Sequence, residues 1–130
     1  MTGVQTCALP ISLPCTNPAS AELYQEIGAS TLNLATDLSL QQIAAIREQV
    51  DIPVDVYVEG PDDFGGPVRH YEVPDLVRVA APIYLKFTVR NSPGLYPAGG
   101  HIQGVVEATA RERVRRASIG IGMLNRYGLK

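Results

Sequence analysis

Three short segments of the chain each pair an apolar face with a polar one, and a helical pattern separates each from the next. The segments are 31–35 (TLNLA), 54–60 (VDVYVEG) and 83–90 (IYLKFTVR). Strands that alternate with helices favour a parallel sheet. The sequence therefore predicts an α/β fold, a partial (β/α) TIM-type barrel with parallel strands, made of about three βα units and a C-terminal helix.

The alternation of side chains along a strand assigns each residue of the last two segments to a face. One face is predicted to carry Val54, Val56, Val58, Ile83, Leu85, Phe87 and Val89. The other is predicted to carry Asp55, Tyr57, Glu59, Tyr84, Lys86, Thr88 and Arg90. In a barrel the aliphatic face packs on helices, and polar residues near the carboxyl ends of the strands are candidate site residues.

The length of the chain predicts an incomplete barrel, because a whole one takes about 250 residues and the chain has 130. Residues 1–11 (MTGVQTCALPI) resemble a translated sequencing adapter, and they lack the basic region of a secretory signal. We expect residues 1–11 to be an artefact and 12–130 to be an incomplete (β/α)-barrel domain. Its uncovered edges would favour self-association.

Composition argues against several classes of partner. The formal net charge is −2 with both signs interspersed, which does not suit binding to nucleic acid or to an anionic membrane. After residue 11, Cys15 is the single cysteine, so the expected location is the reducing cytoplasm. No cofactor or metal is predicted: Asp62 and Asp63 could ligate a hard cation, but their glycine- and proline-rich loop indicates a turn.

Capping signals predict where the first two helices begin. Asn17 can cap a helix over residues 18–27, which has proline at its first position. Ser39 and Gln42 have the spacing of a capping box. The helix that they begin must end before Pro53.

Apolar spacing predicts which side of each helix is buried. The residues expected to face inward are Ala19, Leu23 and Ile27 in the first helix, Leu40, Ile43, Ala44, Ile46 and Val50 in the second, and Leu76, Val77 and Ala80 in a short helix over 73–80. A long last helix, closed by Gly128, carries Ala110, Val114, Ala117, Ile121 and Leu124 at helical spacing. Gly120 and Gly122 predict close packing against a neighbour there.

Four stretches stand in a recognisable order: TDLSL at 36–40, DVYVEG at 55–60, KFTVR at 86–90 and NSPGLY at 91–96. They resemble the peptidase U32 (collagenase-like protease) family, in which a helix begins ELSL, a strand reads roughly E-x-F-x-H-G, and a later strand reads K-I-E-G-R before K-S-P-E-Y. The resemblance spans roughly residues 18–127. It implies the C-terminal part of a barrel domain and a peptidase-like hydrolase.

The chain departs from the family pattern at three places. Glu59 stands where the family has histidine, and Thr88 stands where it has glutamate. Residues 61–64 (PDDF) replace the family's cysteines. Because iron–sulfur clusters need several thiolates, the cluster-dependent hydroxylation of some family members is not expected of this segment.

The candidate catalytic residues are Glu59 and Lys86, with Glu59 as a general base. A carboxylate or phosphate of the substrate would bind to Lys86 and Arg90. The candidate substrate-binding residues are Asn33, Asp55, Tyr57, Arg90 and His101.

Each candidate also has a purely structural interpretation. Asp55 with Lys86, or Glu59 with Arg90, could form ion pairs that only satisfy one another in a polar interior. Tyr57 could be packing, and Asn33 could fix a loop. The expected surface residues are His70, His101 and the basic run Arg111, Arg113, Arg115 and Arg116.

Two functions are therefore open. The first is a U32-like peptidase or hydrolase that acts on a peptide or small carboxylated substrate at the carboxyl-terminal rim of the strands. The second is a non-catalytic ligand-binding or scaffold relative with a structural polar interior.

Overall fold

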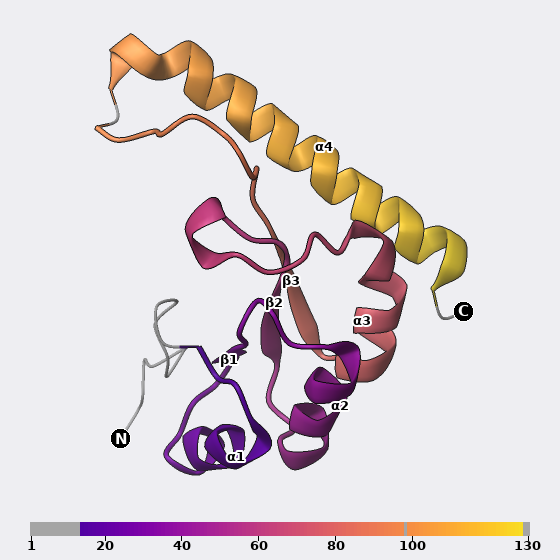
Figure 1. Ribbon diagram of the computed structural model, residues 1–130. Helices are drawn as coiled ribbons and strands as arrows, with labels where there is room; N and C mark the ends of the chain where they lie inside the picture. Colours follow the sequence, from indigo (N-terminus) through magenta and orange to yellow (C-terminus); the bar gives the residue numbers. More distant parts are fainter. Residues whose placement is uncertain (1–13, 98, 129–130) are drawn as a thin grey trace.

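The computed structural model describes residues 14–97 and 99–128 (Figure 1). These residues form an open three-stranded parallel sheet with helices packed against it. The segment 1–11, expected to be an artefact, lies outside the described residues. The α/β class and the parallel strands are confirmed, whereas closure into a TIM-type barrel stays a prediction.

The elements follow one another as expected from the sequence. The strands are β1 (Leu32–Asn33), β2 (Val54–Glu59) and β3 (Ile83–Phe87). The α-helices are α1 (Pro18–Glu26), α2 (Leu40–Gln49), α3 (Val73–Ala80) and α4 (Gln103–Tyr127). Three 3₁₀ turns lie in the connections: η1 (Asp62–Phe64), η2 (His70–Glu72) and η3 (Gly100–Ile102).

The sheet has the order β1-β2-β3, with Leu32 opposite Val54 and Val54 opposite Ile83. β3 is shorter than the predicted 83–90. It ends where Thr88 turns to β2, because the Thr88 amide and hydroxyl both donate to the Glu59 carbonyl oxygen.

A register shift near the end of β2 changes which face Glu59 occupies. Tyr57 lies opposite Lys86, but Glu59 lies opposite Phe87, so Val58 is an extra residue on β2. The Val58 carbonyl accepts a hydrogen bond from the Arg69 amide at 2.7 Å. Since one extra residue reverses the alternation beyond it, the predicted face is wrong for Glu59, which turns toward the helices.

Both predicted helix starts are confirmed. The Asn17 side chain accepts from the Ser20 amide at 2.8 Å. The Ser39 hydroxyl accepts from the Gln42 amide, and the Gln42 side chain accepts from the Ser39 amide. Each cap satisfies amides that the first turn of a helix leaves unpaired.

The core lies between the aliphatic face of the sheet and helices α2 and α3. Its largest fully buried side chains are Leu32, Leu34, Ile43, Ile46, Val54, Val56, Val58, Val73 and Leu76. The inward residues expected of α3 are confirmed, since Leu76 and Ala80 are buried and Val77 packs on the core.

The stripe predicted for α1 is wrong. Leu23 and Ile27 are exposed, whereas Ala21 is fully buried and Tyr24 packs on the core. α1 packs against α2, and its buried residue is Ala21. The apolar spacing of Leu23 and Ile27 therefore does not identify the buried side of α1.

α4 runs along the outside of the molecule, and its N-terminal part extends beyond the sheet (Figure 1). Val114 is 66% exposed, because this part of the helix covers little of the body. Close packing is confirmed at Gly120, where an added Cβ would lie 2.9 Å from Phe87 Cζ. The same expectation is wrong at Gly122, where an added Cβ would have no other atom within 4 Å.

Within the described parts of the chain, no helix has the length and apolar character needed to cross a bilayer.

Candidate functional site

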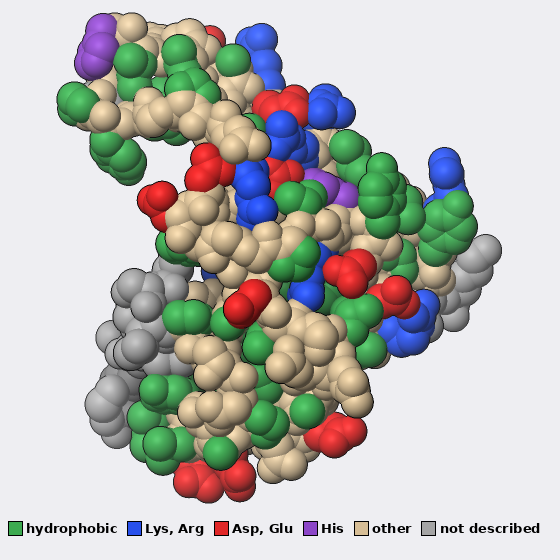
Figure 2. All heavy atoms as spheres, in the orientation of Figure 1, with side chains coloured by type: hydrophobic (Ala, Val, Ile, Leu, Met, Phe, Trp, Pro, Cys, Tyr) green, Lys and Arg blue, Asp and Glu red, His purple; other side chains and the backbone are tan. Residues whose placement is uncertain are grey.

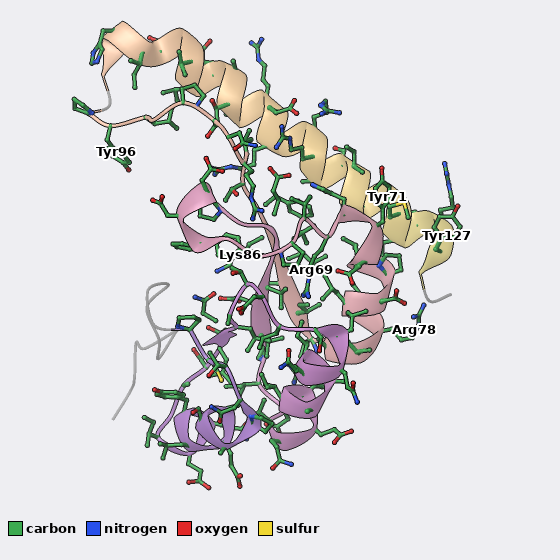
Figure 3. The ribbon with its side chains drawn as sticks, in the orientation of Figure 1. Arg69, Tyr71, Arg78, Lys86, Tyr96 and Tyr127 are labelled. Carbon is green, nitrogen blue, oxygen red and sulfur yellow. The ribbon has the colours of Figure 1, made fainter. Side chains whose placement is uncertain are left out.

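Four of the predicted site residues meet on the polar face of the sheet: Asn33, Asp55, Tyr57 and Lys86, here called the polar-face cluster. Lys86 Nζ donates to Asn33 Oδ1 at 2.7 Å and lies 4.1 Å from the centroid of the Tyr57 ring. Figure 3 shows Lys86 on the side of the strands away from α3. The parallel register brings these residues together, because Asn33 lies opposite Asp55, and Tyr57 lies opposite Lys86.

Partial burial shifts the pKa of two groups in this cluster. Burial raises the pKa of the Asp55 carboxyl, and the nearby Lys86 charge opposes that rise only in part. Burial also raises the pKa of Tyr57. A carboxyl with a raised pKa is a better proton donor or acceptor near neutral pH than an ordinary aspartate.

A cavity of about 260 Å³ opens beside this cluster, at the carboxyl ends of β1 and β2. Its wall includes Pro14, Asn33, Thr36, Asp37, Tyr57 and Phe64. The rings of Tyr57 and Phe64 meet edge to face, with centroids 5.7 Å apart. The mixture of aromatic and polar groups suits a small organic molecule with a polar end.

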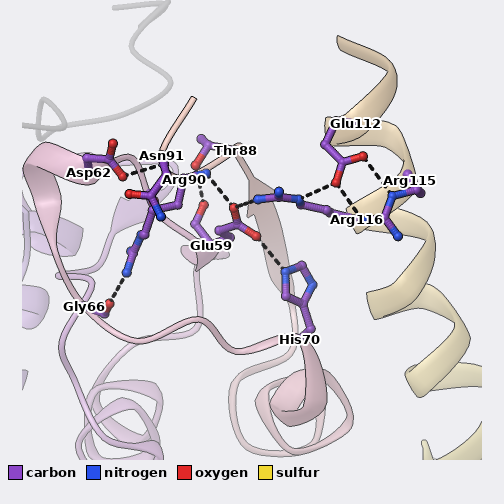
Figure 4. Close-up of polar contacts among 11 residues, drawn as sticks. Glu59, Asp62, Gly66, His70, Thr88, Arg90, Asn91, Glu112, Arg115 and Arg116 are labelled. Carbon is purple, nitrogen blue, oxygen red and sulfur yellow. Dashed lines mark hydrogen bonds and ion pairs between the residues drawn. The ribbon is translucent and has the colours of Figure 1, made fainter. Parts of the chain in front are cut away.

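Glu59 lies in a different set of contacts, here called the Glu59 network, with His70, Arg90, Glu112 and Arg116 (Figure 4). Glu59 Oε1 is 2.8 Å from His70 Nε2. Glu59 Oε2 accepts from the Arg90 amide at 2.6 Å and from the Arg116 guanidinium. Arg116 also binds Glu112.

This network keeps Glu59 ionised. Burial by itself would raise its pKa, but the hydrogen bonds from the Arg90 amide, His70 and Arg116 outweigh burial and lower it. A buried carboxylate that already accepts three hydrogen bonds is poorly suited to take a proton from a substrate. The geometry places Glu59 and Lys86 on opposite faces of the sheet, so the two predicted catalytic residues are not brought together.

Arg90 fixes a loop through its side chain. Its guanidinium donates to the carbonyl oxygens of Gly60, Gly65 and Gly66, at 3.1, 2.8 and 2.7 Å. The contact with Glu59 is made by the Arg90 backbone amide, rather than by the expected side-chain ion pair.

The two histidines lie in different environments. His70 was expected at the surface, and this is wrong: its side chain is 11% exposed and contacts Glu59. His101 is exposed. It lies in η3, which leads into the part of α4 that projects from the sheet in Figure 1, away from the polar-face cluster.

Arg116 was expected on a solvated face, and this too is wrong, because it reaches Glu59. A signal was present in the sequence. Gly120, one of the two positions of expected close packing, lies four residues later on the same helix face, which favours an inward position for Arg116. The described residues contain no group of three or more His, Cys, Asp or Glu side chains that could hold a metal ion.

Comparison with known proteins agrees with the sequence motifs. The model of peptidase family U32 matches residues 8–62, less than half of the chain. The match includes two of the four resembling stretches, 36–40 and 55–60. The match begins within the segment expected to be an artefact. No curated protein and no solved structure gives a significant match. Over residues 8–62, the resemblance of this chain to peptidase family U32 is therefore confirmed, consistent with a fragment of that family.

Proposed function

We propose that this chain carries part of the substrate site of a U32-like hydrolase that acts on a peptide or small carboxylated substrate. The match to peptidase family U32 supports the general class. The observation that carries the proposal is the position of Lys86. Its ammonium group is hydrogen-bonded to Asn33 and lies over the Tyr57 ring, and both Asn33 and Tyr57 line the cavity.

Lys86 suits the recognition of a carboxylate. Its ammonium group can donate three hydrogen bonds, and the contacts with Asn33 and Tyr57 hold it in one place before the substrate arrives. Charge-assisted bonds to a carboxylate are stronger than neutral ones. Asp55 lies opposite Asn33 in the sheet, and burial raises the pKa of its carboxyl. It is our candidate for proton transfer.

The non-catalytic alternative is supported by Glu59. Its carboxylate is fully engaged with His70, Arg90 and Arg116, which fits a structural role. In this alternative, the cavity binds a ligand without cleaving it.

Binding is tested by calorimetry with N-acetylglycine and with its uncharged methylamide. We expect the carboxylate to bind and the methylamide to bind more weakly. Lys86→Gln should weaken binding of the carboxylate about tenfold, because a charge-assisted hydrogen bond is lost. Arg78→Gln is the matched control, since Arg78 is an exposed α3 residue that pairs with Asp75. An equal effect of both substitutions would contradict the proposal.

Cleavage is tested by following the release of free amine from N-acetylated dipeptides. Turnover that is lost in Asp55→Asn, with binding retained, would support the hydrolase. Binding without any turnover would support the ligand-binding alternative.

A further inference from the structure

One wall of the cavity beside the polar-face cluster comes from a loop rather than from the sheet. The loop is 60–66, which contains η1, and its residue Phe64 lines the cavity together with Tyr57 of β2. Figure 1 shows this loop at the side of the molecule, next to the carboxyl ends of the strands. Asp62 and Asp63 of the loop are exposed, and Figure 2 shows acidic side chains at the surface on that side. The loop thus presents charge to solvent and an aromatic ring to the cavity.

The backbone that carries Phe64 is held from two sides. The Thr36 hydroxyl donates to the Phe64 carbonyl oxygen at 3.1 Å. The Arg90 guanidinium donates to the carbonyl oxygens of three glycines of the same loop. The fit is close, because a Cβ at Gly66 would lie 2.7 Å from the Thr36 carbonyl oxygen. A group that is already held in place loses little entropy when a ligand binds.

Phe64 keeps apolar surface that the fold does not cover. Its ring meets Tyr57 edge to face, yet Phe64 is 38% exposed whereas Tyr57 is buried. The cavity of about 260 Å³ also has room for a further ring, since a cavity of about 150 Å³ can hold benzene. An aromatic group of a ligand can therefore lie beside Phe64.

The same tyrosine connects this surface with the candidate carboxylate-binding group. Lys86 Nζ lies 4.1 Å from the centroid of the Tyr57 ring, and the Phe64 centroid lies 5.7 Å from it. A carboxylate at Lys86 and a ring beside Phe64 can thus belong to one small molecule.

We propose that Phe64 is a specificity-determining residue of this cavity, and that it selects a carboxylated substrate with an aromatic side chain. The inference rests on the proposed function, in which Lys86 binds the carboxylate. Paired aromatic rings gain free energy beyond that of their buried area, so the ring contact adds to the charge-assisted one. Arg90 does not line this cavity among the described residues. It is a positioning residue, which acts through the loop 60–66.

The test compares N-acetylphenylalanine with N-acetylglycine by calorimetry on the full chain, each as the carboxylate and as the methylamide. We expect the phenylalanine compound to bind about tenfold more tightly than the glycine compound in either form. Phe64→Leu keeps an apolar side chain on the loop but removes the ring, and it should reduce this preference about threefold. Tyr71→Leu removes an exposed aromatic ring outside the cavity and should leave the preference unchanged.

The positioning role is tested with Arg90→Lys, which keeps the charge but loses the planar group. We expect the preference for the phenylalanine compound to fall as in Phe64→Leu, while the affinity for N-acetylglycine stays unchanged. Arg47→Lys is the matched control. The Arg47 guanidinium also donates to three carbonyl oxygens, at the amino ends of β2 and β3, those of Val50, Ile52 and Pro82. A purely structural role would make the two lysine variants alike, whereas positioning changes the preference only in Arg90→Lys.

The inference and the proposed function fail in different ways. Carboxylates that bind no more tightly than their methylamides would overturn carboxylate recognition by Lys86. Equal affinity for the phenylalanine and glycine compounds would overturn selection by Phe64, as would equal preferences in Phe64→Leu and Tyr71→Leu. An unchanged preference in Arg90→Lys would overturn its positioning role. Binding of none of the four compounds would overturn both proposals.

Discussion

Glu59 is the residue on which several parts of the molecule depend. Its carboxylate contacts η2 through His70, the segment that follows β3 through the Arg90 amide, and α4 through Arg116. A buried charge is tolerated only when it is paired and hydrogen-bonded. These contacts give the end of β2 a polar junction at which three elements meet.

The first prediction concerns this junction. Glu59→Gln keeps the shape of the side chain but leaves Arg116 and His70 without their anion. We expect the free energy of unfolding at neutral pH to fall by about 2 kcal/mol, below the full cost of breaking a buried pair because Arg116 is partly exposed. Urea denaturation measures the change. Glu48→Gln, an exposed position on α2, should have little effect.

The effect of Glu59→Gln on the free energy of unfolding should depend on pH. Because the folded state lowers the pKa of Glu59, the unfolded chain binds the proton more tightly. The stability that Glu59 contributes is therefore present above its ordinary pKa and is lost as pH falls through the folded value. The difference in unfolding free energy between wild type and Glu59→Gln should shrink as pH is lowered below about 4.5. A difference independent of pH would contradict this role.

Arg90 allows a test at the loop that it anchors. Arg90→Lys keeps the charge but loses the planar group that reaches three carbonyl oxygens. We expect a loss of about 1–2 kcal/mol in unfolding free energy and faster amide hydrogen exchange in residues 60–66. Unchanged exchange there would show that the carbonyl contacts do not hold the loop.

At the scale of the elements, α4 docks through a narrow contact. Gly120 lies against Phe87 and Val73, and Arg116 lies one helical turn earlier on the same face. The absence of a side chain at position 120 lets the helix approach β3 and α3. Leu124, one turn later, also packs on the core, whereas Val114 and Ile121 are exposed.

The two glycines of α4 form a matched pair for testing this contact. Gly120→Ala would place Cβ 2.9 Å from Phe87 Cζ, and we expect a loss of about 1–3 kcal/mol from overpacking. Gly122→Ala meets nothing within 4 Å, and it should stabilise the helix by up to about 1 kcal/mol. Thermal unfolding of both variants checks the opposite signs. Equal effects would show that α4 is not docked through Gly120.

At the scale of the whole molecule, the sheet ends at β1 and β3. The outer side of β1 is bridged by Cys15, which bonds Asn33 and Ala35, so β3 is the more open edge. An outer strand presents unpaired backbone groups to any other strand. Tyr84 on β3 is 57% exposed and adds apolar surface beside that edge. The open sheet therefore offers a surface on which copies of the chain can associate.

We predict that the isolated chain self-associates through β3. Size-exclusion chromatography should show oligomers whose fraction rises with concentration. Tyr84→Lys, which places a charge beside the edge, should reduce that fraction, whereas Tyr71→Lys, an exposed residue outside the strands, should not. A monodisperse monomer at all concentrations would contradict the prediction.

Local sequence determined most of the elements. The capping box of Ser39 and Gln42 and the inward residues Leu76 and Ala80 depend on neighbours within one or two helical turns, so their pattern is visible in the chain. The grouping of Asn33, Asp55, Tyr57 and Lys86 was also predictable, because strand alternation and parallel order determine it.

Tertiary structure decided the rest. The face of Glu59 depends on the register between β2 and β3, where one extra residue at Val58 reverses the alternation. The burial of His70 and the reach of Arg116 depend on where α4 crosses the sheet. Contacts between residues far apart in the chain set both features. Helical spacing from Gly120 can favour an inward side for Arg116, but it does not identify Glu59 as the partner. Local patterns in the chain thus account for the helices, the strands and one polar cluster. Packing between distant segments decides the face and the partners of Glu59.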